Sequence, residues 1–215
     1  MIVYHFHLRY KLSTPHTVRI YGFTLIVNPT VFHPKYYFSS KFFADYLYSI
    51  DIKRKKVLDM GCGSGIISIV TASRGGIVCA IDINSEAVKT TMQNAGENQL
   101  NESIATFQGD LFTPLPPEAK FDYILFNPPF YPSEPKSTTE QAWKGGNDYR
   151  VITEFIDNSS TYLSNEGKIL ILLSSDMDIP RILERFVLRK YGTVRVQTKR
   201  TLFDTLYIYE ATRHS

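Results

Sequence analysis

The sequence predicts an α/β protein: a seven-stranded, mostly parallel sheet with helices on both faces, an antiparallel C-terminal hairpin and a small N-terminal β appendage. Short apolar runs alternate with segments whose apolar residues recur at helical spacing, which is typical of strands and helices in turn. Only residues 201–203 separate the last two runs, and so short a connection requires an antiparallel pair. The 215 residues, with 43% hydrophobic content, are enough for one full core.

The main domain is expected to cover residues 51–215. We expect its strands at residues 55–60, 77–82, 103–108, 121–126, 168–174, 193–200 and 204–211. We expect its helices at residues 64–74, 85–98, 147–163 and 177–190. Residues 165–167 (Asn-Glu-Gly) should end the third of these helices, because glycine often follows a helix C-terminus, and Pro180 should lie in the first turn of the fourth.

Residues 1–50 are expected to form a small appendage. Residues 3–10 and 17–27 alternate polar and apolar side chains, which predicts two strands. His5 and His7 share one face of the first strand, but no third ligand accompanies them, so no metal site is expected.

Two further segments are expected to border the site. Residues 38–50 look like an amphipathic helix capped by Ser39 or Ser40. The polar segment 131–146 is a candidate lid or substrate-selecting loop, in which Trp143 either packs or contacts substrate.

Composition narrows the class of protein. Cys62 and Cys79 lack metal-ligand spacing and are expected to be reduced core thiols in a cytoplasmic protein. We find no run of 18 apolar residues and no signal peptide, so no membrane association is expected. The net charge is +3, but residues 181–200 hold seven basic residues and one acid. This segment predicts either a phosphate-facing surface or a solvated helix followed by a charged edge strand.

The tetrapeptide Asn-Pro-Pro-Phe at residues 127–130 is the most informative motif. It follows a predicted strand, and open α/β sheets bind ligands at the carboxyl ends of their strands. Its prolines lack N–H donors, which leaves carbonyl oxygens as acceptors. The Asn127 side chain and the Pro128 carbonyl can accept both hydrogens of a flat NH2 group while Phe130 stacks on it. The motif therefore predicts chemistry on an amide or a base amine, with an ordinary proline-rich turn as the alternative.

A glycine turn follows the first strand of the main domain. Gly61, Gly63 and Gly65 allow close approach of a ligand, and the helix that follows offers N–H groups. The spacing is G-x-G-x-G, with Ile66 where a dinucleotide site carries its third glycine or alanine. Asp59, just before the turn, favours a ligand with a positive centre, such as the ammonium and sulfonium of S-adenosylmethionine.

Asp82 ends the next strand, 23 positions after Asp59, where an acid can accept hydrogen bonds from two ribose hydroxyls. The alternative is a helix cap, for which Asn84 and Ser85 are also available.

A third acid, Asp110, follows the third strand and can accept from an adenine amine. Ile83 beside Asp82 and Leu111 beside Asp110 are the apolar candidates for the same ligand. Asp110 by itself is weak evidence, because Gly-Asp is a common turn dipeptide.

These motifs, in this order, resemble those of class I S-adenosylmethionine-dependent N-methyltransferases, which have a Rossmann-like fold. Over roughly residues 31–212 the chain is similar to the HemK-type methyltransferases of release-factor glutamines. Gly145 and Gly146 favour that group over base methylases, although the group usually carries another glycine where Tyr149 stands. The resemblance implies S-adenosylmethionine as cofactor and a helix, here 38–50, that covers it. The implied cofactor-binding residues are Asp59, Gly61, Gly63, Gly65, Asp82, Ile83, Asp110, Leu111 and Asn127.

We therefore expect an N-methyltransferase with Asn127, Pro128 and Phe130 as catalytic residues and a release-factor glutamine N5 as the foremost substrate. One alternative is the exocyclic amine of an RNA or DNA base, adenine N6 or guanine N2, which the basic C-terminal third supports. Another is a non-catalytic cofactor-binding protein, against which the presence of Asn127, Asp59 and Asp82 argues. Some relatives work with a small zinc-binding partner protein; otherwise a monomer is expected.

Overall fold

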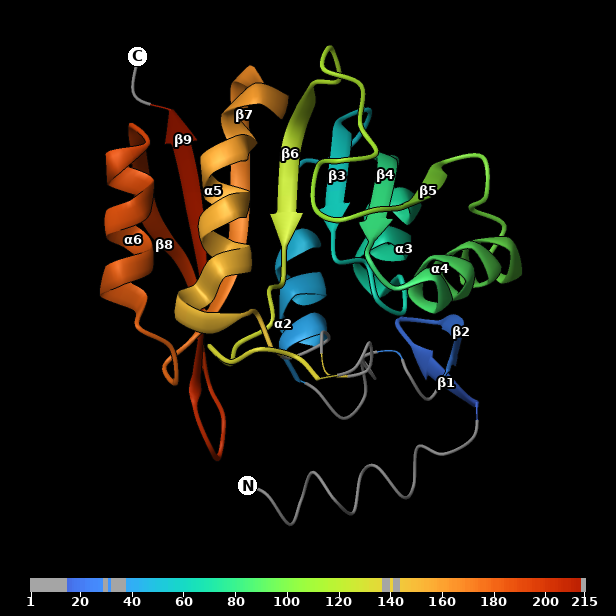
Figure 1. The fold of residues 1–215 in the computed structure, drawn as a ribbon. Helices are drawn as coiled ribbons and strands as arrows, with labels where there is room; N and C mark the ends of the chain where they lie inside the picture. The colour runs from blue at the N-terminus through green and yellow to red at the C-terminus, as the bar shows by residue number, and fades with distance from the viewer. Residues whose placement is uncertain (1–14, 29–30, 32–37, 137–139, 141–143, 214–215) are drawn as a thin grey trace.

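The computed structural model describes residues 15–28, 31, 38–136, 140 and 144–213 (Figure 1). Its strands are β1 (His16–Ile20), β2 (Phe23–Val27), β3 (Lys56–Met60), β4 (Ile77–Asp82), β5 (Ile104–Gln108), β6 (Phe121–Phe126), β7 (Leu163–Ser174), β8 (Tyr191–Arg200) and β9 (Thr205–Arg213). Its helices are α2 (Phe38–Leu47), α3 (Ile66–Ser73), α4 (Ser85–Glu97), α5 (Arg150–Tyr162) and α6 (Ile179–Leu188), with a 3-10 turn, η2 (Asn147–Tyr149).

The main sheet has seven strands in the order β5-β4-β3-β6-β7-β9-β8. The strands from β5 to β7 are parallel, whereas β9 is antiparallel to both β7 and β8. A separate two-stranded sheet, β1-β2, lies near the N-terminus. The α/β class, the seven-stranded sheet, the antiparallel C-terminal hairpin and the small N-terminal β unit are thus confirmed.

Helices cover both faces of the sheet, and side chains along each central strand alternate between two cores. On β7, Leu170 and Leu172 belong to the core shared with α2 and α3, whereas Ile169, Ile171 and Leu173 belong to the core shared with α5 and α6. Burial on both faces explains why these strands read as continuous apolar runs in the sequence.

The parallel strands bring the sequence motifs to one edge. The last residue of β3, Met60, pairs with Ile81 of β4 and with Phe126 of β6, so these strands end side by side. In Figure 1 their arrowheads point to the same edge, where α2 also lies.

The helix expected over residues 147–163 is shorter than predicted. It begins at Arg150 and ends at Tyr162, and residues 165–167 lie inside β7 instead of ending a helix. A Cβ at Gly167 would come within 2.8 Å of the Leu163 side chain and of a β6 carbonyl. Gly167 therefore permits close contact between β6 and β7 at a register shift. In the sequence, a glycine with this role looks the same as a glycine that ends a helix.

The N-terminal unit also differs from the prediction. Residues 17–27 are not one strand but a hairpin, in which Tyr21 and Gly22 form a two-residue turn with φ of 55° and 83°. Its β2 edge is bound by two side-chain amides, from Asn94 in α4 and from Asn98 at the C-cap of that helix. Asn94 exchanges hydrogen bonds with the Ile26 backbone at 2.7 Å each way, and Asn98 does the same with the Thr24 backbone at 3.1 and 2.8 Å. The strand predicted at 3–10, with His5 and His7, lies outside the described residues, as does Trp143.

Helix starts follow the sequence signals only in part. Asn84 caps α4 and Asp178 caps α6, with Pro180 in the first turn as predicted. Ser39 and Ser40, expected as caps, lie inside α2 and are buried. The prediction of a cap was wrong because it used only the local sequence, which does not show which residues pack against the helix.

The basic segment 181–200 forms α6 and the edge strand β8. Arg185 and Arg189 both pair with Asp157, and hydrogen bonds from Arg189 and Arg185 lower the pKa of that carboxyl to about 2. Arg181 pairs with Asp148. These contacts favour the charged-helix and edge-strand interpretation. None of the described helices is long and apolar enough to cross a membrane, and Cys62 and Cys79 are free thiols.

Candidate active site

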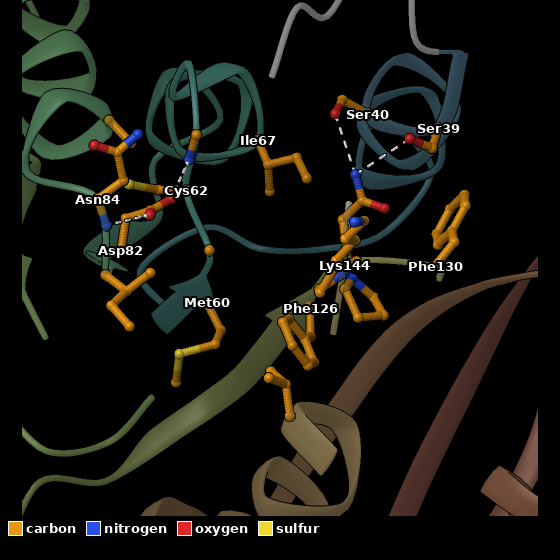
Figure 2. A pocket seen from close by; sticks show the side chains of 18 of the residues that line it. Ser39, Ser40, Met60, Cys62, Ile67, Asp82, Asn84, Phe126, Phe130 and Lys144 are labelled. Carbon is orange, nitrogen blue, oxygen red and sulfur yellow. Dashed lines mark hydrogen bonds between the residues drawn. The ribbon is translucent and has the colours of Figure 1, made fainter. Parts of the chain in front are cut away.

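A cavity of about 340 Å³ lies at the carboxyl edge of the sheet (Figure 2). It brings together most of the predicted site residues: Gly61, Gly63, Asp82, Ile83, Asp110, Leu111, Asn127, Pro128 and Phe130. Asp59 and Gly65 do not line it. Figure 2 shows Cys62, Asp82 and Asn84 at one end and Ser39, Ser40 and Phe130 at the other.

The glycine turn is fixed mainly by hydrogen bonds within the protein. Its three glycines have φ of 71°, 55° and 81°, in the left-handed region that glycine adopts without strain. The N–H groups of Gly61 and Cys62 donate to the Ile81 carbonyl at 2.8 and 3.0 Å, and that of Gly63 donates to Asp82. These three N–H groups are therefore bonded within the protein, whereas the prediction concerns the N–H groups at the start of the helix that follows.

Gly65 serves packing between helices. A Cβ at this position would lie 3.0 Å from the Thr91 side chain, and Thr91 itself donates to the Gly63 carbonyl at 3.2 Å. Gly65 thus lets α3 approach α4 while α4 holds the turn.

Asp82 is oriented by two backbone N–H groups. Its two carboxylate oxygens accept from the Gly63 N–H at 3.0 Å and the Asn84 N–H at 2.9 Å. Burial raises the pKa of Asp82, and those two hydrogen bonds oppose the rise. Asn84, not Asp82, caps α4 with its side chain. Each carboxylate oxygen still has acceptor capacity toward the cavity, since an ionised carboxyl offers about four acceptor sites.

Asp59 lies behind the turn. It is buried, one oxygen accepts from the Ser68 hydroxyl at 2.5 Å, and the other has no hydrogen-bond partner. Burial, above all, raises the pKa of Asp59 to about 7, and the nearby Asp82 adds to the rise. The prediction places Asp59 among the cofactor-binding residues; its carboxyl lies outside the cavity lining, from where it can act on the cavity through its field.

The wall beyond Asp82 is apolar with one acid. Ile83 is 41% exposed although it is a large aliphatic side chain, and Leu111 adopts a left-handed φ of 47°. Both line the cavity beside the exposed Asp110. Two aliphatic side chains next to a carboxylate suit a flat ring that carries an amine.

At the opposite end, Asn127 is held by two hydroxyls that the sequence did not identify as site residues. Its Nδ2 donates to Ser39 Oγ at 3.3 Å and to Ser40 Oγ at 3.1 Å, and Figure 2 shows both bonds converging on one amide nitrogen. Its Oδ1 is buried without a partner. A buried polar atom of this kind costs about 1–3 kcal/mol unless a donor reaches it.

Pro128 and Phe130 complete this end. Pro128 is buried, and Phe130 is half-buried where the two cores meet. Pro129 packs against Gly145, where a Cβ would come within 3.2 Å of it, and the Gly145 N–H donates to the Tyr131 carbonyl at 2.9 Å. Gly145 therefore lies against the tetrapeptide, where any side chain would require the proline ring to shift by a few tenths of an ångström.

Tyr149, where the resembled group carries glycine, has φ of 58°, a conformation that favours glycine. Burial of its ring and a hydrogen bond from the Asp178 N–H to its hydroxyl, at 3.0 Å, offset that strain.

The outer rim includes acids and a hairpin tip. Tyr131, Asp176, Phe203 and Asp204 line the cavity, and Phe203 in the β8–β9 turn is 70% exposed. Burial raises the pKa of Tyr131, and the nearby carboxylates of Asp176 and Asp204 raise it further. In the described part of the chain, no group of three His, Cys, Asp or Glu side chains has the arrangement of a metal site.

Comparison with known proteins decides the family. The model of the methyltransferase small domain matches residues 22–206. The chain belongs to this family. As a member, it is 39% identical over 132 residues to a putative protein N5-glutamine methyltransferase of Methanocaldococcus jannaschii, covering 59% of this chain and 65% of that protein.

Other relatives of this methyltransferase small-domain protein are named as RNA methyltransferases. It is 31% identical over 142 residues to ribosomal RNA small subunit methyltransferase C of Haemophilus influenzae, covering 65% of this chain and 38% of that protein. The chain thus spans less than two thirds of the length of these curated relatives.

Two solved structures share the fold. The E. cuniculi Mtq2–Trm112 complex, responsible for methylation of the eRF1 translation termination factor, superposes with a TM-score of 0.67 at 22% identity, over 86% of this chain and 99% of that chain. The T. thermophilus 16S rRNA N2-guanine methyltransferase in complex with AdoMet and guanosine superposes with a TM-score of 0.70 at 21% identity, over 93% and 50%.

Proposed function

We propose that the chain is an S-adenosylmethionine-dependent N-methyltransferase that acts on a planar nitrogen, foremost the N5 of a glutamine in a peptide-chain release factor. The observation that carries the proposal is the buried, unpartnered Oδ1 of Asn127, which shares a cavity with the oriented carboxylate of Asp82. At the first end, Asn127 Oδ1 needs a hydrogen-bond donor, which the NH2 group of a substrate would supply. At the other end, the Asp82 carboxylate can accept hydrogen bonds from the two hydroxyls of a ribose.

The residues present fit this cofactor. Asp82 would accept from the ribose hydroxyls, Ile83 and Leu111 would enclose the adenine, and Asp110 would accept from its amine. Gly61 and Gly63 would border the methionine half. When bound, S-adenosylmethionine supplies an electrophilic methyl group on a positively charged sulfur.

Asp59 and Gly65 would contribute indirectly. The negative field of Asp59 would favour a cationic ligand over a pyrophosphate. Gly65 would keep the turn in position through its packing on α4.

At the acceptor end, Asn127 Oδ1 and the Pro128 carbonyl would accept hydrogen bonds from the two N–H groups of the target amide. An amide nitrogen is a poor nucleophile because its lone pair is delocalised. Two acceptors oppose that delocalisation, and Phe130 fixes the plane of the group. No strong base is required, since the nitrogen proton becomes acidic as the N–C bond forms and the S–C bond breaks, and solvent water would take it up. Positioning and preorganised dipoles would therefore provide most of the acceleration.

The rim supports a protein amide over a nucleic-acid base. Asp176 and Asp204 repel phosphate, and the two described basic residues of the cavity lining, Lys144 and Arg150, are paired with glutamates. On α6, Arg185 and Arg189 are paired with Asp157. The relation to ribosomal RNA methyltransferases keeps the exocyclic amine of a base as the second candidate.

Single-turnover transfer from labelled S-adenosylmethionine distinguishes the two substrates. A release-factor fragment with its Gly-Gly-Gln loop and unmodified ribosomal RNA would be tested side by side. We expect label in the fragment. Label in the RNA alone would establish the base-methylating function instead, and label in neither would contradict both.

Two further assignments belong to this proposal. Residues 1–50 would act as an appendage that includes the cavity-covering helix, with the catalytic domain at 51–215. The likeness to Mtq2, which forms a complex with Trm112, supports a small activating partner protein. Transfer assayed with and without co-expressed small zinc proteins would test the partner.

A further inference from the structure

We infer that Ser39 and Ser40 are positioning residues, which hold the Asn127 carboxamide with its oxygen toward the acceptor group. This inference rests on the proposed function. The two hydroxyls accept both hydrogens of Asn127 Nδ2, at 3.3 and 3.1 Å, and the serines are only 4% and 6% exposed (Figure 2).

The orientation matters because the two ends of a carboxamide have opposite hydrogen-bonding character. A half-turn about χ2 exchanges oxygen and nitrogen with almost no change in shape. With the oxygen toward the cavity, Asn127 can accept from an NH2 group. With the nitrogen toward the cavity, the Asn127 NH2 group would face the NH2 group of the substrate, so two donors would meet. The substrate would then lose one of its two hydrogen bonds.

Among the described residues, the Asn127 side chain hydrogen-bonds to the two serines and to no other member of the tetrapeptide. Pro128 and Pro129 have no N–H, so neither can donate to Oδ1. A serine hydroxyl has two lone pairs and can accept a hydrogen bond whichever group its own hydrogen reaches. Two such hydroxyls side by side match the two hydrogens of one NH2 group.

The serines have no evident advantage for folding. Their neighbours on α2, Phe42, Phe43 and Ala44, belong to the apolar core. Alanine has a higher helix propensity than serine, and a buried hydroxyl is unfavourable without a partner. The hydrogen bonds from Asn127 give these hydroxyls a partner and offset the cost of burying them.

The test uses the full chain with Ser40→Ala and Ser39→Ala/Ser40→Ala. One hydrogen bond of about 1 kcal/mol corresponds to roughly 5-fold. We expect the single-turnover rate at saturating cofactor to fall about 5-fold in the single variant and about 25-fold in the double variant. The cofactor Kd should stay within about twofold of wild type, because Asp82 and the glycine turn are unchanged.

Ser159→Ala is the matched control. Ser159 is also a fully buried helical serine, bonded to the Tyr191 hydroxyl at 2.9 Å, but it lies outside the cavity lining. This variant should lose at least as much thermal stability as the double variant and keep the wild-type rate.

A double-mutant cycle separates positioning from general structure. In an Asn127→Ala background, removal of both hydroxyls should slow transfer by less than twofold, because no carboxamide remains to be oriented. The inference is overturned if the serine variants keep the wild-type rate, if they slow Asn127→Ala by the same factor as wild type, or if only the cofactor Kd changes. A fully active Asn127→Ala would instead remove the proposed function itself.

Discussion

The two ends of the cavity differ in the kind of group that makes their hydrogen bonds. At the Asp82 end, the polar contacts are between backbone amides of adjoining segments and one carboxylate, within a turn fixed by glycine dihedral angles. At the Asn127 end, they are between side chains of α2 and the loop after β6. Backbone contacts follow directly from the ends of adjacent parallel strands, whereas side-chain contacts require a helix to pack in one register. We therefore expect the first end to control affinity and the second to control rate.

Replacement of Asn127 by alanine should have the largest effect on rate. Loss of one preorganised polar group should slow single-turnover transfer on the order of 100-fold or more. The cofactor Kd should change little, because the Asp82 end is intact. Asn127→Asp should also be slow, since its negative charge would attract the cationic centre in the ground state. Full activity of Asn127→Ala would remove the distinction between the two ends.

Asp82→Ala should show the opposite pattern. Loss of hydrogen bonds to an ionised acceptor should weaken cofactor binding by roughly 1.5–3 kcal/mol, as measured by calorimetry. The rate at saturating cofactor should fall much less. Asp82→Asn, which keeps one acceptor oxygen, should be intermediate. Unchanged affinity in Asp82→Ala, or tighter binding of NAD, would show that this end holds another ligand.

Asp59→Asn should change the pH dependence of stability. The pKa of Asp59 is about 7 in the folded chain and about 4 when unfolded, so between these values only the folded state holds the proton. The free energy of unfolding of the ligand-free wild type should therefore fall by about 1.4 kcal/mol per pH unit as pH rises from 4 to 7, and Asp59→Asn lacks this contribution.

Urea titrations of both proteins between pH 5 and 8 measure the difference. The advantage of the variant should grow with pH and level off above 7. Parallel pH profiles would mean that the Asp59 carboxyl is already ionised at pH 5. A nearby ligand cation should in turn release the proton, which calorimetry in buffers of different ionisation enthalpy would detect.

The smallest expected effects concern Phe130. Phe130→Tyr should keep the single-turnover rate within about threefold, because stacking requires only the ring. Phe130→Ala should lose about 0.5–1.5 kcal/mol of transition-state stabilisation, in addition to packing against both cores. Equal rates for the two variants would assign Phe130 to packing alone.

The sequence by itself determined which strands the sheet contains and which motifs lie at its edge. Apolar runs, the glycine turn, Asp82 and the tetrapeptide are local patterns, and parallel strands bring their carboxyl ends together whatever the details of packing. The same patterns misassigned residues 165–167, where glycine relieves a strand contact, and predicted a single strand at residues 17–27, which form a hairpin.

Tertiary structure decided the contacts between segments that are distant in the chain. Ser39 and Ser40 lie 88 and 87 positions from Asn127, and Asn94 lies 68 positions from Ile26. It also placed Asp59 behind Ser68 instead of in the cavity. These features depend on how helices pack on the sheet. That packing geometry determines which group a side chain bonds to. The partner cannot be predicted from the residue type or from the neighbouring sequence.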